Sequence, residues 1–188
     1  TGRMTHSNPN LANVPSVKTT WGSRCRELFV VPPGYKMVGV DAEGLELRML
    51  AHYMKDEDYI NAVHSGQKDE GTDVHNVNQK AAGLATRDVA KTFIYAYLYG
   101  AGAEKIGKIA GTDAVGGQKL IARFLSQTPS LQDLRERVKE IAAKGSVPGI
   151  DGRRIHIREP HKALNALLQG AGAIIMKKAL VLLADRIE

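Results

Sequence analysis

One helical segment of this sequence has two faces that differ in chemistry. Thr86 is a typical N-cap residue, and Gly100 and Gly102 are typical of a helix end, so the sequence predicts a helix from residue 86 to about residue 99. Side chains spaced by four residues share a face of such a helix. One face comprises Arg87, Lys91 and Tyr95, and the opposite face comprises Val89, Phe93, Ala96 and Gly100. The apolar face is expected to pack, which leaves the basic face available to a ligand.

This basic face is suited to a triphosphate, because Arg and Lys bind phosphate oxygens and Tyr95 offers a ring to a base or sugar. A solvated basic face with an unrelated tyrosine is the alternative interpretation of the helix taken alone. His75 precedes the helix and can donate to a phosphate oxygen, although a lone histidine is more often a surface or core residue. The glycine-bearing stretch at residues 102–107 lacks the Lys-Ser/Thr ending of a P-loop, so that kind of nucleoside triphosphatase is not predicted.

An acidic run at residues 41–48 lies where the predicted structure changes from strand to helix. Residues 35–40 follow a Pro-Pro-Gly turn signal and predict a short strand, and apolar residues recur at helical spacing from Leu45 to Met54. Asp41 therefore stands at the end of a strand, where its carboxylate suits Mg²⁺, which prefers oxygen ligands and takes few of them from protein. The alternative interpretation is that Asp41 caps the helix that follows.

The other segments predict helices and one hairpin. Helical patterns cover residues 74–82, a segment that ends near Leu125, and a segment that begins near Pro129. Within residues 150–158 an Asp-Gly turn leads into alternating apolar and basic residues, which predicts a hairpin with one basic face for nucleic acid. A last helix, residues 162–188, places Asn165 and Gln169 on one side. The first 16 residues are predicted to be mostly irregular.

The charge balance favours a polyanionic partner. The chain has a formal net charge of +6, and each phosphate that Lys or Arg neutralises releases condensed counterions. Cys25 is the single cysteine, so no internal disulfide can form, which fits a reducing compartment such as the cytoplasm. No window of the sequence is expected to reach the apolar length of a membrane span, and no membrane partner is predicted.

Four segments in sequence order resemble the signatures of family A, DNA polymerase I-like, DNA polymerases, and their details resemble the phage replicative branch. The segments are Thr1-Gly2-Arg3-Met4, Asn10-Leu11-Ala12-Asn13-Val14-Pro15, the run from Asp41 to Arg48, and Arg87-x3-Lys91-x3-Tyr95-x3-Tyr99-Gly100. The resemblance implies template-directed DNA synthesis, in which deoxynucleoside triphosphates are added to a primer 3′ end by two-metal nucleotidyl transfer. It implies primer-template DNA and deoxynucleoside triphosphates as partners and two Mg²⁺ ions as cofactors.

The resemblance assigns metal-binding and catalytic roles to a few residues. Asp41 and Lys91 are implied to be catalytic, and Asp41 is implied to ligate both Mg²⁺ ions with the backbone carbonyl of Ala42 as a further ligand. Glu46 is implied to block the 2′ position of the incoming sugar and so to favour deoxyribose. Tyr99 is implied to pack near Glu46 and to help form this gate.

The contacts to the rest of the nucleotide also follow from the resemblance. His75, Arg87 and Lys91 are implied to hold the triphosphate, and Tyr95 is implied to stack beside the new base pair and sugar. Ala96 departs from the family, which often has glycine there. Its methyl group is expected to restrict the approach of the template base.

Contacts to DNA are implied for four residues. Arg3 resembles a residue that reads the minor-groove edge of the nascent pair, and Asn165 and Gln169 match a polar pair that contacts primer and template. Arg153, in the predicted hairpin, is a further candidate for DNA binding. The alternative for Asn165 and Gln169 is that they are satisfied polar residues on a largely buried helix.

The predicted fold class is α+β, with part of a polymerase palm sheet and a mostly helical fingers subdomain. Residues 1–55 are assigned to the palm, residues 56–144 to the fingers and residues 145–188 to a return to the palm. The thumb, any exonuclease and the family's second metal carboxylate, in a His-Asp hairpin, are expected outside the chain. The chain alone is therefore predicted to be inactive or nearly so. A processivity factor is possible but cannot be inferred from these residues.

Two alternative functions stay open. A single-subunit RNA polymerase shares a palm and a Lys/Tyr helix, but Glu46 and the spacing from Arg87 to Lys91 speak against it. A non-catalytic nucleic-acid-binding module derived from a polymerase would keep Arg3, Arg153 and Arg154 and would need no second carboxylate. The retention of metal-binding and triphosphate-binding residues together makes this module the weaker hypothesis.

Overall fold

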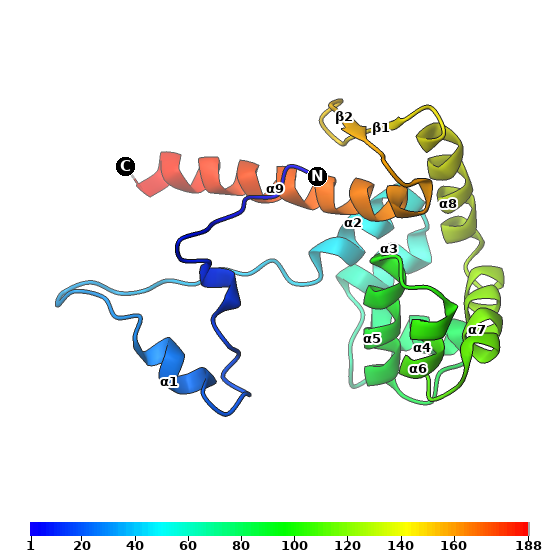
Figure 1. Cartoon of the computed structure of the whole chain (residues 1–188), viewed down its shortest axis with the longest axis horizontal. Coiled ribbons are helices and arrows are strands. Elements are labelled where there is room, and N and C mark those ends of the chain that lie inside the picture. The colour runs from blue at the N-terminus through cyan, green and yellow to red at the C-terminus, as the bar shows by residue number, and fades with distance from the viewer. Residues whose placement is uncertain (188) are drawn as a thin grey trace. The chain divides into compact units, whose positions relative to one another are not determined.

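The computed structural model describes residues 1–187 and divides into two compact units, Arg3–Glu43 and the chain from Gly44 onward together with Thr1 and Gly2. Residue 188, the last of the predicted palm return, lies outside the described residues. The described residues form helices and one two-stranded sheet, which confirms the α+β class (Figure 1). The boundaries predicted at residues 55 and 144 stay predictions.

The unit Arg3–Glu43 is mostly irregular. It contains a 3-10 helix, η1 (Leu11–Asn13), and one short α-helix, α1 (Gly22–Glu27). The prediction of a strand at residues 35–40 was wrong, and Val38 within it is 82% exposed. A strand needs a neighbour to pair its backbone N–H and C=O groups, and the described part of the chain supplies no strand that pairs with this segment.

The second unit is built mainly from helices joined by short connections. Its first seven helices are α2 (Leu45–Met54), α3 (Glu57–His64), α4 (Val74–Ala82), α5 (Arg87–Leu98), α6 (Ala103–Ile109), α7 (Ala114–Ser126) and α8 (Pro129–Ala142). α4 packs along α5, and α6 packs along α7. The predicted helices at residues 45–54, 74–82 and 86–99, and those near Leu125 and Pro129, are confirmed, whereas α3 and α6 were not predicted.

Local capping fixes the connection between α4 and α5. The Asp73 side chain accepts a hydrogen bond from the backbone N–H of Asn76 at the start of α4 (3.0 Å), and the Thr86 side chain accepts one from Val89 at the start of α5 (3.3 Å). Gly83 ends α4 with φ 71°, a left-handed conformation that glycine adopts without a Cβ penalty. The two helices are therefore joined by a short connection with a defined end and a defined start.

An aromatic cluster between α5 and α7 lies at the centre of the core. The rings of Phe93 and Phe124 meet edge to face with centroids 5.1 Å apart, and Tyr97 lies 5.7 Å from Phe124. Phe93 and Phe124 are completely buried. The buried residues of α5 are Ala90, Phe93, Ile94 and Leu98. One side of this helix packs into the core, as predicted. Of the predicted face, however, only Phe93 is fully buried, whereas Val89 and Ala96 are partly buried and Gly100 is exposed.

The predicted hairpin is present. β1 (Ser146–Pro148) and β2 (Arg154–His156) pair antiparallel, with Val147 opposite Ile155. Both of these central residues are buried, whereas Arg154 and His156 are exposed. The alternation predicted from the sequence therefore gives the hairpin one apolar and one basic face.

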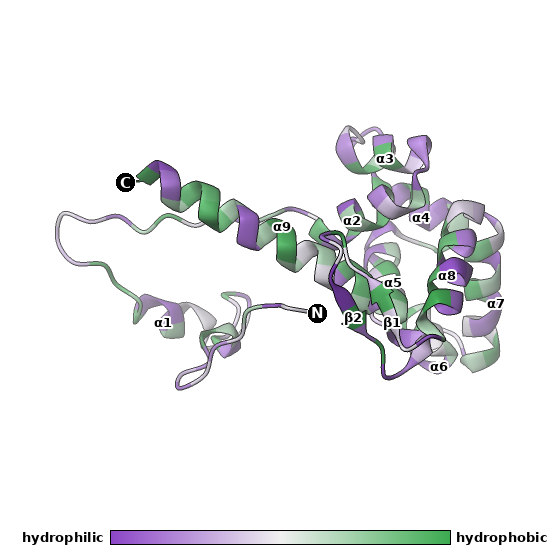
Figure 2. Cartoon of the chain, turned by 90° about the horizontal axis from the view of Figure 1, so that it is seen from above, coloured by the Kyte–Doolittle hydropathy of each residue, from purple (hydrophilic) through white to green (hydrophobic). Residues whose placement is uncertain are grey.

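The last helix, α9 (Ala163–Ile187), follows a 3-10 turn, η2 (Pro160–Lys162). Its first half is buried, and Gly170 packs so closely that a Cβ there would lie 2.8 Å from Cδ1 of Ile155. Its second half extends away from the helix cluster with hydrophobic residues along it (Figure 2).

This helix corrects one expectation of the sequence analysis. The segment Pro160–Ile187 is long and apolar enough to cross a membrane by length and composition, with 28% of its most apolar window buried. The expectation that no window reaches this length was wrong. Core helices of globular proteins pass the same test, and the first half of α9 packs in the core. Length and composition alone therefore assign no membrane role.

Candidate functional site

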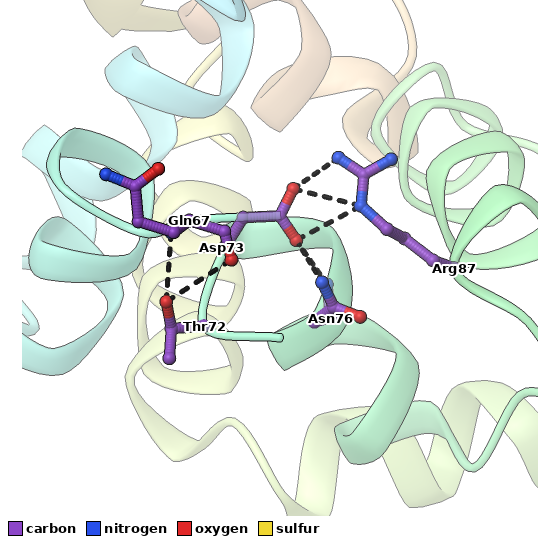
Figure 3. A network of polar contacts seen from close by, with 5 residues as sticks. All are labelled: Gln67, Thr72, Asp73, Asn76 and Arg87. Carbon is purple, nitrogen blue, oxygen red and sulfur yellow. Dashed lines mark hydrogen bonds and ion pairs between the residues drawn. The ribbon is translucent and has the colours of Figure 1, made fainter. Parts of the chain in front are cut away.

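The carboxylate of Asp73, the N-cap residue of α4, holds a guanidinium on α5 (Figure 3). The Nε of Arg87 donates to both carboxylate oxygens of Asp73, at 3.0 and 3.2 Å, and its Nη2 forms an ion pair with Oδ2 of the same carboxylate. The amide nitrogen of Asn76 donates to Oδ1 of Asp73 at 2.6 Å. The side chains of Asp73 and Arg87 are 12% and 24% exposed, so this ion pair is largely shielded from water. The Asp73 carboxylate thus anchors the start of α5 to the start of α4.

The environment of the pair shifts the pKa of both groups. Burial alone would raise the pKa of Asp73, but the hydrogen bonds from Arg87 and Asn76 together outweigh it and lower this pKa to about 2. The hydrogen bond to Asp73 is also the main reason that the pKa of Arg87 is raised. The pair therefore stays ionised across the physiological pH range.

His75 lies two residues after Asp73, on the same helix, and is buried. Its ring is 6.2 Å from the ring of Tyr95, with an angle of 51° between the planes. Burial lowers the pKa of His75, and the positive charges of Arg87 and Lys91 lower it further. Its Nδ1 has no hydrogen-bond partner within the described residues. The imidazole is therefore neutral at pH 7, with one nitrogen able to donate a hydrogen bond.

The structure brings together the side chains that the sequence analysis grouped on one face of α5. Arg87 and Lys91 are close enough for their charges to act on His75, and the ring of Tyr95 neighbours that histidine. Lys91 is exposed, and Tyr95 is half-buried. We call His75, Arg87, Lys91 and Tyr95 the α4–α5 cluster. It offers two cations, one neutral donor and one ring to a ligand.

The opposite end of α5 is tied to two other helices. The hydroxyl of Tyr99 donates to Oε1 of Glu46 on α2 at 3.1 Å, as expected from the resemblance. The amide nitrogen of Asn165 on α9 donates to the backbone carbonyl of Leu98 at 3.1 Å. Asn165 therefore satisfies one of the carbonyls that a helix end leaves unpaired.

The candidate metal ligands, Asp41 and Ala42, belong to the unit Arg3–Glu43, and Asp41 is exposed. The alternative that Asp41 caps the next helix is wrong, because the N-cap of α2 is Gly44. Within residues 1–187 no group of three or more His, Cys, Asp or Glu side chains is placed to hold a metal. One carboxylate and one carbonyl nevertheless match the oxygen chemistry of Mg²⁺, which takes further ligands from water and phosphates.

The remaining candidates for DNA binding lie in different parts of the chain. Arg3 is exposed and belongs to the unit Arg3–Glu43. Arg153 is exposed in the turn of the hairpin, where its Nε donates to Oδ2 of Asp151 at 2.7 Å. Gln169 is half-buried on α9, one turn after Asn165.

Asp73 is the site residue that the sequence analysis missed. Its capping role can be predicted, since an aspartate directly before a helix is a typical N-cap. Its pairing with Arg87 joins the starts of two helices through residues that are 14 positions apart in the sequence, and no local pattern indicates it.

Comparison with known proteins supports the resemblance seen in the sequence. The sequence model of DNA polymerase family A matches residues 1–188. DNA-directed DNA polymerases of Enterobacteria phage T3 and Escherichia phage T7 are each 42% identical over 203 residues, covering 94% of this chain and 28% of each relative. DNA polymerase I of Pseudomonas aeruginosa is 33% identical over 96% of this chain and 22% of that protein. The chain thus spans less than a third of the length of these curated relatives.

A solved structure shares the fold. The POL domain of Pol1 from M. smegmatis, in complex with DNA primer-template and dNTP, superimposes with a TM-score of 0.82 and 26% sequence identity. The match covers 99% of this chain and 36% of that one. The phage relatives confirm the resemblance to the phage replicative branch. By its sequence and its fold, the chain belongs to DNA polymerase family A.

Proposed function

We propose that the α4–α5 cluster binds the triphosphate of an incoming deoxynucleotide during template-directed DNA synthesis at a primer 3′ end. The observation that carries this proposal is that His75, Arg87 and Lys91, whose side chains can all donate to phosphate, lie together at the junction of α4 and α5. A triphosphate is a polyanion, so two cations and a neutral donor together match its charge and its oxygens. The primer-template and dNTP in the M. smegmatis structure support this choice of ligand.

The members of the cluster differ in what they contribute. Arg87 is held in place by Asp73 and supplies a fixed planar donor, whereas Lys91 is exposed and supplies a mobile point charge. Lys91 can therefore follow the charge that develops on the phosphates during the reaction, which is the catalytic role proposed for it. The half-buried ring of Tyr95 stacks beside the base pair and sugar of the nucleotide.

Glu46 and Tyr99 form the proposed gate against ribonucleotides. The Tyr99 hydroxyl holds the Glu46 carboxylate at 3.1 Å, which restricts the movement of that carboxylate. A fixed carboxylate at the 2′ position leaves no room for a ribose hydroxyl. Discrimination against ribose thus depends on the position of Glu46.

Mg²⁺ is proposed to bind at Asp41 and at the backbone carbonyl of Ala42. Two such ions, when bound, neutralise phosphate charge and activate the primer hydroxyl for in-line attack. The exposed carboxylate of Asp41 is accessible to ions and phosphates. Because the described residues hold no further carboxylates grouped for a metal site, we propose that this chain alone has little or no polymerase activity.

Primer-template DNA is the second proposed partner, with Arg3, Arg153, Asn165 and Gln169 as its contacts. Asn165 already uses its amide nitrogen on the carbonyl of Leu98, so its amide oxygen is the atom proposed to contact DNA. Arg153 is exposed, and its ion pair with Asp151 lies at the surface, where such pairs are weak. Phosphate can therefore compete for the Arg153 guanidinium at low cost.

Primer extension by the whole protein that carries this chain tests the proposal. The wild-type protein is expected to add the complementary deoxynucleotide, and Asp41→Asn is expected to lower kcat by about 100-fold or more while primer-template binding is kept. The matched control is Asp69→Asn, which changes an exposed carboxylate outside the site. Equal activity of Asp41→Asn and Asp69→Asn would refute the metal-binding role.

A further inference from the structure

We infer that Asp73 is a positioning residue, which orients the Arg87 guanidinium so that its remaining nitrogen faces the phosphates of the nucleotide. The inference rests on the proposed function of the α4–α5 cluster and deepens it. It assigns to Asp73 no contact with the nucleotide. It makes the affinity for the nucleotide depend on a carboxylate behind the arginine.

The geometry of the ion pair leaves part of the guanidinium available. Asp73 binds Arg87 from the side, through Nε and Nη2 (Figure 3). The third guanidinium nitrogen, Nη1, has no hydrogen bond to any other residue between 1 and 187. Because arginine is a planar fork with five donor hydrogens, one carboxylate on its side edge leaves donors for a second anion. A phosphate can thus add to Arg87 without displacing Asp73.

The Asp73 carboxylate is itself held in place. Its Oδ1 accepts from the backbone nitrogen of Asn76 and from the amide nitrogen of the same residue, at 3.0 and 2.6 Å. The loop in front of it is also fixed, since the backbone nitrogen of Gln67 donates to Oγ1 of Thr72 at 2.9 Å (Figure 3). A Cβ on Gly66 would lie 2.6 Å from Cα of Asp73, so the loop packs tightly against this position. These contacts restrict the movement of the carboxylate, so it offers Arg87 a fixed position.

Anchoring Arg87 in this way joins the two halves of the cluster. His75 lies two residues after Asp73 on α4, and Arg87 is the first residue of α5. The ion pair therefore fixes the position of Arg87 relative to His75. An arginine without this anchor would lose side-chain entropy on binding a phosphate, and pre-organisation removes part of that cost.

A purely structural role for Asp73 is the competing explanation, because the residue also caps α4. Asp73→Asn separates the two roles, since asparagine is as good an N-cap as aspartate and has nearly the same volume. It removes only the negative charge that holds the guanidinium. Asp113→Asn is the matched control, because Asp113 caps α7 through Gly116 at 2.7 Å and forms no ion pair within the described residues.

The test is single-nucleotide incorporation by the whole protein, with KM for the deoxynucleotide and kcat measured separately. We expect Asp73→Asn to raise KM by about 10-fold or more and to change kcat by less than about 3-fold, and Asp113→Asn to change neither. In a protein that already carries Arg87→Ala, Asp73→Asn is expected to cause no further rise in KM, because Asp73 acts on the nucleotide only through Arg87. Asp73→Ser, which also keeps a capping side chain, is expected to repeat the result if Asp73→Asn folds poorly.

Two outcomes would overturn the inference. One is an unchanged KM in both folded Asp73 variants. The other is that Asp73→Asn raises KM as much in the Arg87→Ala protein as it does in the wild-type protein. Failure of the proposed function would look different, since the wild-type protein itself would then show no incorporation that depends on the deoxynucleotide. The two failures are therefore distinguishable in one experiment.

Discussion

The hydroxyl of Tyr99 donates a hydrogen bond to Oε1 of Glu46 over 3.1 Å, which connects the end of α5 to the first turn of α2 across 53 positions of the sequence. The helix that carries the proposed triphosphate contacts at its start thus also contacts, at its end, the carboxylate proposed as the sugar gate. The two functions share one rigid element, so a change at either end of α5 can be tested for its effect at the other.

Tyr99→Phe removes the donor and keeps the ring. We expect the preference for deoxynucleotides over ribonucleotides, measured as a ratio of kcat/KM values, to fall by about 2- to 10-fold, because one hydrogen bond contributes about 0.5–1.5 kcal/mol. Tyr97→Phe on the same helix is the control, since the Tyr97 hydroxyl is buried without a partner within the described residues. If both variants show the same sugar preference, the hydrogen bond does not hold the gate.

The acid sensitivity of the protein should depend on Asp73. Its pKa is lowered to about 2 by hydrogen bonds that outweigh its burial, so its contribution to stability is complete above the unfolded value of about 4 and is lost as the pH falls through about 2. We expect Asp73→Asn to lower the free energy of unfolding by about 2 kcal/mol at pH 7 and by much less near pH 2. Melting temperatures of both proteins across this pH range provide the measurement. A constant difference between them from pH 7 to pH 2 would contradict the assignment.

Local signals were sufficient to predict much of the helical unit. The cap at Thr86 and the glycine after Tyr99 enclose α5, so both of its ends could be predicted from neighbouring residues. The hairpin followed from the Asp-Gly turn and from the alternation around Ile155. In each case the residues that decide the structure lie close together in the sequence.

Features that depend on tertiary packing could not be predicted. α6 was missed because Gly107 lies inside it, and glycine weakens a helix by about 1 kcal/mol relative to alanine. The structure explains this glycine, since a Cβ there would lie 2.0 Å from the carbonyl oxygen of Asp113. The ion pair between Asp73 and Arg87 likewise depends on how α4 lies against α5, which the spacing of residues does not specify.

The contact between α9 and α5 predicts a stability effect at Asn165. In Asn165→Asp a carboxylate replaces the amide that donates to the carbonyl of Leu98, so a bond is lost and two acceptors face each other. We expect a loss of about 1–3 kcal/mol in the free energy of unfolding, seen as a lower Tm. Gln169→Glu, one turn later on the same helix, is the control and should lower the free energy of unfolding less. Equal losses would show that Asn165 has no special structural role.

The aromatic cluster predicts the largest loss of stability. Phe124 is completely buried against Phe93, with ring centroids 5.1 Å apart. Phe124→Ala is expected to cost about 3–5 kcal/mol, because it removes buried apolar area and leaves a cavity. Ile141→Ala on α8 is the control, since Ile141 is 41% exposed. Thermal unfolding followed by circular dichroism should separate the two variants clearly, and similar melting temperatures would contradict the assignment of this core.

The deoxynucleotide dependence of primer extension by the whole protein, with Arg87→Ala or Lys91→Ala, tests whether the α4–α5 cluster binds the triphosphate. If the α4–α5 cluster binds the triphosphate, each variant raises KM for the deoxynucleotide by about 10-fold or more and leaves Kd for primer-template DNA unchanged. Lys119→Ala, which changes an exposed lysine on α7, provides the control. A deoxynucleotide KM that stays at the wild-type value in both variants would contradict the account.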